Sequence, residues 1–470
     1  MKGDQALEGP ESGQPVIWAG IDWGTHSSKW AYFRRNDAHT IPVVGPIRNS
    51  NLLKKQKDLI FSPQIGYPSK VKPVHSIKKR IINDPASAFW DGVRSDTETT
   101  IGEAVAFSLT NLLVDLSVDL AKKGIHPDPK KPWEIGFSLP NWVEEEDEVQ
   151  RAALTHFHQA VMVALSIFVR SGPEKLPKPE QPFEIVAWRT LVTKVVEGFK
   201  SSGIAGWEDG SSGISAESLV RKDIYHVGAL RSSYIVESCA AGLPYLKAMG
   251  DPREDDSPKI RKLLVVDVGA GSTDIGYMLR SVSPRDNRWV MNYFTPGNTH
   301  GLAGDDLTER IQRGLRDEGR AVSFEEAQAE KERGVGRDWP AVKDWIRDIA
   351  RHAADYIRVI EDTVRLPHDP PLEIILTGGS GPSIPDLAEE IRRQVVYALQ
   401  RKGFGPIAGR TEIADVLLPE YGLPDAFAYA RRIVSLGAAD PEKPRLSHID
   451  SLKRSEPGRV QVITWRGSGG

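Results

Sequence analysis

The sequence has a single cysteine, Cys239, among 470 residues. An intrachain disulfide is therefore impossible, which suits a reducing compartment. The first fifteen residues lack the apolar core of a secretory signal peptide, and no uncharged apolar run approaches membrane-spanning length. We therefore expect a cytoplasmic protein with no membrane partner, in which residues 1–15 form a disordered leader.

An excess of charge of either sign is also missing. The 61 Lys and Arg residues nearly balance the 64 Asp and Glu residues, which leaves a formal net charge of -3. Bulk charge therefore does not indicate nucleic acid as a partner. Hydrophobic residues make up 40% and charged residues 27% of the chain, as is typical of globular proteins. A chain of this length predicts two or more domains.

Apolar runs and their spacing predict the main strands and helices. Strands are expected at residues 16–22, 134–139, 263–267 and 374–376, and an edge strand at 460–465. Apolar residues at helical spacing predict helices over 100–120, 183–199 and 342–364, and the acidic run at 144–148 is expected to open another helix.

Three of these strands run into a glycine turn, in the segments GIDWGTHSSK (20–29), VVDVGAGSTD (265–274) and ILTGGSGPSIP (375–385). Glycines let the backbone approach a phosphate closely, with the turn N–H groups directed at it. Asp22 and Asp267 directly precede two of the turns, and a carboxylate at a strand end can hold Mg²⁺ through water. One such turn is weak evidence, because glycine turns are common. Three in this order predict a site for Mg²⁺ and a triphosphate.

The three motifs resemble the two phosphate loops and the adenosine loop of the actin-fold ATPase superfamily. Segments 76–82, 136–154, 237–246, 299–311 and 430–439 are similar, in family order, to other segments of DnaK-type heat-shock chaperones, among them the two connecting helices at 237–246 and 430–439. The resemblance runs from residue 16 to about 440. It implies an α/β protein with a two-lobed actin-like ATPase fold, built from duplicated ribonuclease-H-like lobes that each contain a five-stranded sheet.

The resemblance also implies a division of the chain. The first lobe would span 16–255, the second 256–425, a connecting helix 426–440 would return to the first lobe, and 441–470 would form a tail. Within the lobes, subdomains are implied at about 41–131 and about 304–350, and the first lobe carries an insertion at about 170–233.

Roles for single residues come from the resemblance only. Asp22 and Asp267 would hold Mg²⁺ through water, and Glu237 would orient the attacking water. Lys79 would contact the γ-phosphate, with Lys78 as the competing choice because the alignment can slip by one residue. The residues implied to contact the nucleotide are Gly24, Thr25, His26, Ser27, Gly269, Gly271, Ser272, Gly304, Lys331, Gly378, Gly379 and Ser380.

The implied function is an ATPase that binds ATP and Mg²⁺, hydrolyses ATP slowly and acts as a conformational switch on a protein partner. The chaperones continue into a peptide-binding domain, for which the thirty residues 441–470 are too few. A filament-forming or scaffold ATPase is one alternative. A small-molecule kinase is another, because Ser27, Ser28 and Lys29 also resemble sugar-kinase loops. Ser383 stands where the chaperones have an adenine-stacking arginine, so base selectivity is expected to be relaxed.

The insertion at 170–233 is the expected docking element for the protein partner or for self-assembly, because a segment this long with apolar residues must pack on something. A subdomain packed on the first lobe is an equal alternative. His156 and His158, two apart on a predicted helix, point to different sides, so no metal site is expected there. Cys239 is interpreted as buried packing.

Overall fold

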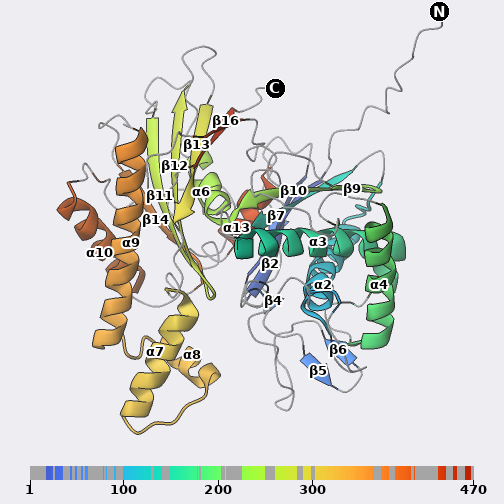
Figure 1. Ribbon diagram of the computed structural model, residues 1–470, viewed down its shortest axis with the longest axis horizontal. Helices are drawn as coiled ribbons and strands as arrows, with labels where there is room; N and C mark the ends of the chain where they lie inside the picture. Colours follow the sequence, from blue (N-terminus) through green and yellow to red (C-terminus); the bar gives the residue numbers. More distant parts are fainter. Residues whose placement is uncertain are drawn as a thin grey trace, which may run out of the picture.

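The computed structural model is shown in Figure 1. It describes residues 17–24, 27–34, 43–44, 48–49, 54–56, 59–61, 78, 81, 89–91, 99–128, 132–139, 148–176, 178, 182–202, 207, 225–248, 260–282, 289–297, 302–364, 372–379, 387–403, 407, 432–440, 448–451 and 461–466.

A mixed seven-stranded sheet forms the centre of the N-terminal half. Its strands are β1 (Ile17–Trp23), β2 (Ser27–Arg34), β3 (Val43–Val44), β4 (Arg48–Asn49), β7 (Trp133–Leu139), β9 (Tyr225–Val227) and β10 (Leu230–Val236). Their spatial order is β3-β2-β1-β7-β10-β9, with β4 also beside β2. The β1–β2 pair is an antiparallel hairpin, whereas β1, β7 and β10 are parallel. Strand β1 is buried along most of its length, which explains its nearly continuous apolar sequence.

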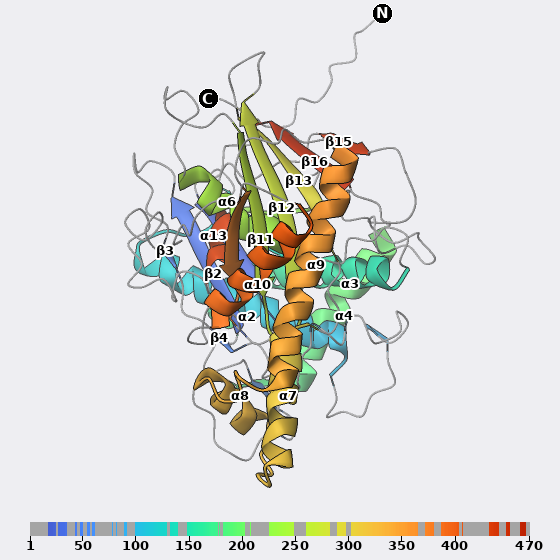
Figure 2. The ribbon, with the colours of Figure 1, turned by 90° about the vertical axis from the view of Figure 1, so that its left-hand side faces the viewer.

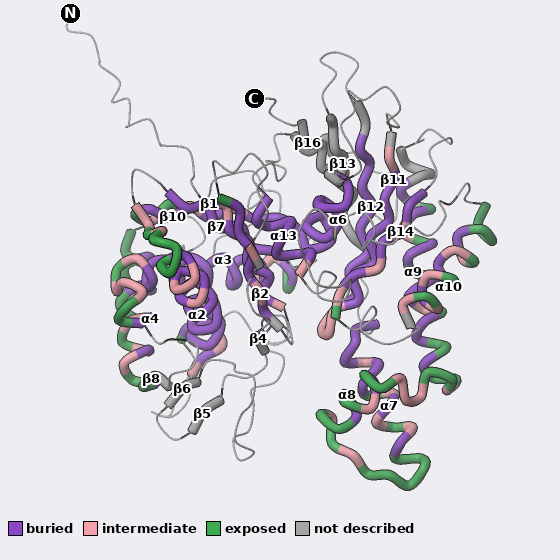
Figure 3. The backbone as a smooth tube through the Cα atoms, turned by 180° about the vertical axis from the view of Figure 1, so that it is seen from behind, coloured by how far each residue is buried: buried purple, intermediate pink, exposed green. Residues whose placement is uncertain are grey.

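Three helices complete the first lobe with this sheet: α2 (Ile101–Lys122), α3 (Glu148–Ser171) and α4 (Ile185–Ser202), of which α4 packs on α2 and α3. A capping box between Thr100 and Glu103 begins α2. By length and composition α2 and α3 are apolar enough to cross a membrane, but 78% and 83% of their most apolar windows are buried inside the protein. They are core helices, as the buried colouring in Figure 3 shows.

Helix α4 belongs to the predicted insertion and packs on the body of the first lobe. Trp188 is fully buried, and its indole N–H donates a hydrogen bond of 2.9 Å to the Glu103 carbonyl. A small three-stranded sheet of β5 (Lys54–Gln56), β6 (Leu59–Phe61) and β8 (Pro182–Glu184) ties the insertion to the 41–131 segment. The described part of the insertion is therefore an integral part of the lobe.

A second mixed sheet has six strands. They are β11 (Ile260–Val268), β12 (Thr273–Val282), β13 (Trp289–Gly297), β14 (Leu372–Thr377), β15 (His448–Ser451) and β16 (Gln461–Arg466), in the order β14-β11-β12-β13-β16-β15. Again the first two strands form a hairpin, and β11 is parallel to β14. The edge-strand prediction for 460–465 was wrong, because β16 lies between β13 and β15. Both sheets exceed the five strands implied by the resemblance.

The helices of the second sheet, which complete the second lobe, are α7 (Gly304–Asp317), α8 (Phe324–Glu332), α9 (Pro340–Val364) and α10 (Leu387–Arg401). The predicted apolar face of α9, including Trp345 and Ile349, is buried in the core of this lobe. Figure 2 shows α7 and α8 projecting beyond the end of the sheet, while α9 runs along it.

Two short helices, α6 (Glu237–Ala248) and α13 (Ile433–Ala439), lie between the two sheets (Figure 1). The two helices cross very closely, because a Cβ at Gly437 of α13 would overlap the backbone of Ala240 of α6. Helix α13 also packs closely on β1, where a Cβ at Gly20 would overlap the backbone of Ser435. On its other side α6 packs on the second sheet, where Gly242 faces Met278. The chain is thus an α/β protein with two mixed sheets joined by crossing helices.

Candidate functional site

Asp22 and Asp267 lie at the ends of strands from the two different sheets. Asp22 precedes the turn of the β1–β2 hairpin and Asp267 precedes the turn of the β11–β12 hairpin, and both residues are buried. They are near enough that the charge of Asp22 raises the pKa of Asp267. The packing of α6 and α13 between the sheets therefore brings together two carboxylates that are distant in the sequence.

Glu237, the first residue of α6, lies in the same place. Its Oε1 accepts hydrogen bonds from Lys78 Nζ at 2.5 Å and from Ser138 Oγ at 3.5 Å. Lys78 and Glu237 are both buried, so their ion pair is shielded from water. Of the two lysines considered for the γ-phosphate contact, Lys78 contacts Glu237, whereas Lys79 lies outside the described residues.

The hairpin partners of the two aspartates complete the site. Lys29 lies opposite Asp22 across the first hairpin, and its Nζ is 2.9 Å from Asp22 Oδ2. Asp274 lies opposite Asp267 across the second hairpin and is also buried. We refer to the whole set as the acidic centre: Asp22, Lys29, Lys78, Glu237, Asp267 and Asp274.

The charges of the acidic centre do not balance, because four carboxylates face two lysines. Burial raises the pKa of Asp267 to about 7, together with the negative charges of Glu237 and Asp22, against the opposing effects of Lys29 and Thr377. Burial and the neighbouring Glu237 likewise raise the pKa of Asp274 well above its usual range.

The pKa of Lys78 is also raised, but for a different reason. Burial lowers its pKa, but the negative charges of Glu237, Asp274 and Asp22 together outweigh burial, so its net pKa is raised. The acidic centre therefore holds this lysine charged and still keeps an excess of carboxylates.

The excess of carboxylates fits a divalent cation. Mg²⁺ prefers oxygen ligands and retains much of its water shell. Within the described part of the chain, no group of three or more His, Cys, Asp or Glu side chains is placed to hold a metal ion directly. Asp22 and Asp267 are the carboxylates that would hold a hydrated Mg²⁺ through water.

Glycine is required where the turns approach this site. Gly378 follows β14 with a φ of 90°, and a Cβ there would overlap the carboxylate of Asp267 and the carbonyl of Val268. At Gly269 a Cβ would lie 2.9 Å from the Ser272 carbonyl, and Ser272 Oγ donates a hydrogen bond of 3.1 Å to Asp274 Oδ2. The second and third predicted loops are thus adjacent.

Lys331 and Gly304 meet at the N-terminus of α7. The Gly304 N–H donates a hydrogen bond of 2.8 Å to the Gly269 carbonyl, which fixes α7 on the second turn. Lys331 Nζ donates to the Gly304 carbonyl at 3.0 Å and to Thr308 Oγ1 at 2.8 Å. Burial lowers the pKa of Lys331 to about 8, although the negative charges of Asp305 and Glu332 oppose this shift.

Of the remaining predicted residues, four are described by the structure and three are not. Gly24 and Gly271 are half-buried in their turns and Gly379 is exposed. Ser27 begins β2 opposite Asn49. Thr25, His26 and Ser380 lie outside the described residues.

The chain matches no protein-family model, and no curated protein shows a significant match to it.

The residues that sequence reasoning missed are Lys29, Asp274 and Ser138. The signal for the first two is the hairpin itself, because each lies seven positions after an aspartate and directly opposite it in the antiparallel pair. Ser138 carries no comparable signal in the sequence.

Two further expectations concern α3 and α6. Burial lowers the pKa of both His156 and His158 to about 4, and His158 Nδ1 bonds the Tyr234 hydroxyl at 2.7 Å. Both histidines are therefore core residues. Cys239 is buried, and burial raises the pKa of its thiol to about 12, so it is a packing residue and no nucleophile.

Proposed function

We propose that this protein is an actin-fold ATPase that binds ATP with Mg²⁺, hydrolyses it slowly and uses the bound nucleotide to change the arrangement of its two sheets. The observation that supports the proposal best is the convergence of the two hairpin ends on the Lys78–Glu237 ion pair. Two strand–turn–strand units from different sheets face each other there, each with a buried aspartate directed at the same centre.

The repeated topology supports the fold part of the proposal. In each sheet a hairpin is followed by a strand parallel to its first member, as β7 follows β1–β2 and β14 follows β11–β12. The helices α6 and α13 cross between the two sheets, as the connecting helices implied by the resemblance would. A duplicated fold of this kind is what a two-lobed actin-like ATPase requires.

The acidic centre contains the groups that phosphoryl transfer to water needs. Such reactions depend on positioning and on stabilising charge, with little covalent chemistry for the protein. Glu237 would orient the attacking water, and Lys78 would donate to the γ-phosphate as negative charge develops there. Mg²⁺, when bound through Asp22 and Asp267, would supply neutralisation of the phosphate charge.

The position of the site supports a switch. The acidic centre is made of residues from both sheets, and α6 begins in it with Glu237. A ligand that contacts both hairpins binds one arrangement of the two sheets better than another, and so shifts the population toward that arrangement. A change of this kind would be transmitted along α6 and α13 to both lobes.

The direct test is Asp267→Asn, which removes the charge and keeps the shape of the side chain. We expect Mg²⁺-dependent ATP turnover to fall by about 100-fold or more, with the circular dichroism spectrum unchanged. Asp338→Asn is the matched control, because the Asp338 side chain is 81% exposed on the surface. Wild-type turnover in the Asp267 variant would refute the proposal.

One observation favours a small-molecule kinase as the second candidate. Lys29, which belongs to the segment that resembles sugar-kinase loops, lies in the acidic centre against Asp22. A kinase would form ADP faster when its acceptor is present, whereas an ATPase switch would not. ADP release measured with and without a panel of sugars and polyols separates the two functions.

The insertion is the proposed contact for a protein partner or a second copy of the chain. One face of α4 is buried on the first lobe through Trp188, and Val186 on the opposite face is 57% exposed. Removal of residues 172–231 would uncover α2, so a surface change is the better test. Val186→Glu should leave ATP binding intact and reduce partner binding or self-assembly measured by light scattering. Unchanged association would limit the insertion to a structural role.

A further inference from the structure

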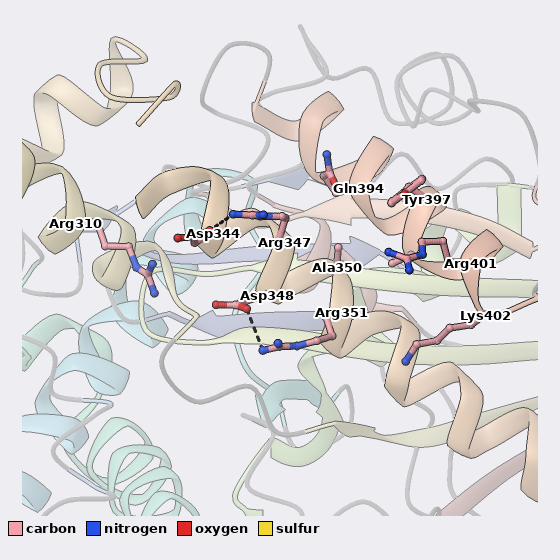
Figure 4. Close-up of a pocket in the computed structure, with 11 residues that line it drawn as sticks. Arg310, Asp344, Arg347, Asp348, Ala350, Arg351, Gln394, Tyr397, Arg401 and Lys402 are labelled. Atoms are coloured by element: carbon pink, nitrogen blue, oxygen red, sulfur yellow. Dashed lines mark hydrogen bonds and ion pairs between the residues drawn. The ribbon is translucent and has the colours of Figure 1, made fainter. Parts of the chain in front are cut away.

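A charged groove with a volume of about 780 Å³ lies on the second lobe, between the outer faces of α9 and α10 and next to α7 (Figure 4). Figure 1 places α9 and α10 on one side of the second sheet and α6 on the other. The groove is therefore separate from the acidic centre, and a ligand bound in it would not require the proposed ATPase activity.

The lining of the groove is strongly basic. It has five cationic side chains and two carboxylates, and because Lys402 also pairs with Asp355, which does not line the groove, positive charge still exceeds negative charge by two in a chain whose formal net charge is -3. The cations are Arg310, Arg347, Arg351, Arg401 and Lys402, and the acids are Asp344 and Asp348. A local excess of this size attracts an anionic partner by steering its approach.

The two carboxylates are already engaged within α9. Arg347 pairs with Asp344, and Arg351 lies 3.0 Å from Asp348, in each case one helical turn away. Exposed pairs of this kind contribute at most about 1 kcal/mol, so an incoming carboxylate can replace them at little cost. Among the described residues no carboxylate lies within ion-pair distance of Arg401.

The wall of the groove on α10 adds an apolar contact. Tyr397 is 54% exposed, one of only three large hydrophobic residues exposed to this degree in the described part of the chain. The Arg401 guanidinium lies 5.8 Å from the centre of its ring. Two small residues, Ala350 and Ala398, line the groove between the helices and leave it open. Tyr and Arg are both enriched at protein interfaces.

The shape of the groove selects the class of ligand. Sites for small molecules enclose most of the ligand and fix it with a few buried polar groups. Here the charged side chains are exposed or half-buried and lie on the first half of α9, at the end of α10 and on α7, as Figure 4 shows. Asp344 and Asp348 among the arginines would repel a continuous phosphate backbone, whereas a peptide of mixed composition can avoid them. We propose that the groove binds an acidic segment of a partner protein, with its carboxylates on Arg351 and Arg401 and an apolar side chain against Tyr397.

The test uses the full-length protein and a fluorescein-labelled peptide rich in Glu with a central Leu, followed by fluorescence anisotropy at low ionic strength. The double variant Arg351→Glu/Arg401→Glu should weaken peptide binding by about tenfold or more. The control is Arg313→Glu/Arg333→Glu, which makes the same change of net charge at exposed positions on α7 and beside α8, outside the groove. The control variant should bind the peptide within about twofold of wild type.

Tyr397→Ala distinguishes a specific side-chain contact from long-range electrostatic attraction. It removes no charge, and we expect it to weaken the peptide by about fivefold, in the range of an exposed aromatic contact. Circular dichroism checks that each variant is folded.

Three results would overturn the proposal. They are an absence of peptide binding to the wild type, an equal loss in the groove and control variants, and tighter binding of a single-stranded oligonucleotide of the same net charge through the same arginines.

Discussion

The β1–β2 and β11–β12 hairpins have the same construction but opposite charge patterns. In each, an aspartate before the turn lies opposite the residue seven positions later. In the first hairpin that residue is Lys29, so Asp22 has a partner in its own hairpin. In the second it is Asp274, so two carboxylates lie side by side. Like charges directly opposite each other destabilise a strand pair.

The difference shows which half of the site depends on the rest of the molecule. The Asp22–Lys29 pair of the first hairpin is neutral by itself, whereas the Asp267–Asp274 pair of the second relies on a cation from elsewhere. Lys78, whose pKa is raised partly by Glu237 and Asp274, supplies one positive charge. A bound cation would stabilise this hairpin by neutralising the negative charge that Lys78 leaves uncompensated. We therefore expect the second hairpin to respond more strongly than the first to changes in metal, pH and charge.

The largest expected effect comes from Lys78→Met, which leaves Glu237 and the second hairpin without their buried cation. Removal of one partner of a buried ion pair destabilises proteins by about 3–5 kcal/mol. Urea unfolding without Mg²⁺ would measure the loss, and ATP turnover should be lost as well. Lys123→Met is the control, because the Lys123 side chain is 41% exposed. A Lys78 variant as stable as the control would show that the second hairpin does not depend on this lysine.

Single substitutions in the two hairpins should have opposite effects on the stability of the metal-free protein. Lys29→Met leaves Asp22 buried without its cation and should destabilise the metal-free protein by about 1–3 kcal/mol. Asp274→Asn relieves the repulsion and should stabilise the metal-free protein by a similar or smaller amount. Thermal unfolding with and without MgCl₂ reports both effects. Mg²⁺ should stabilise Lys29→Met more than wild type and Asp274→Asn less. Shifts of the same sign in both variants would contradict the comparison.

The smallest effect is a pH dependence of the second hairpin. Because the pKa of Asp267 is raised to about 7 in the folded protein, its contribution to stability is complete below about pH 4 and is lost as the pH rises through 7. The free energy of unfolding measured in EDTA should therefore fall between pH 4 and 7. Its slope should be shallower than the about 1.4 kcal/mol per pH unit that corresponds to one full proton.

Two buried histidines work against this slope. The pKa values of His156 and His158 are lowered to about 4, so their contribution is lost as the pH falls from 6.5 to 4. The informative quantity is therefore the difference between wild type and Asp267→Asn over the same pH range. Identical slopes in the two proteins would remove Asp267 from the explanation.

Much of the fold can be predicted from local sequence patterns. The apolar run at 263–267 predicted the core of β11, and helical spacing over 342–364 predicted α9 to within two residues. Thr100 and Glu103 form a capping box that marks the start of α2. The strand at 460–465 was predicted correctly as a strand but wrongly as an edge, because nothing in a single strand identifies its neighbours.

The candidate site was only partly predictable, for a related reason. Asp22 and Asp267 could be found because a carboxylate before a glycine turn is a local feature. Lys79 was preferred for the γ-phosphate contact and Lys78 kept as the alternative, since adjacent lysines in a polar segment are nearly equivalent in sequence. In the structure Lys78 contacts Glu237, whereas Lys79 lies outside the described residues.

The sequence by itself determined several strands and helices, among them β1, β11 and α9, and the aspartates that precede two glycine turns, because strand, helix and turn preferences depend on neighbouring residues. The tertiary structure decided which charges face one another. Glu237 meets Lys78 across 159 positions, and Asp22 reaches Asp267 only because glycines at positions 20 and 437 let α13 pack closely on β1 and α6. Such encounters depend on packing between distant segments, and the electrostatic energy of a buried charge is set by the charges that this packing places beside it.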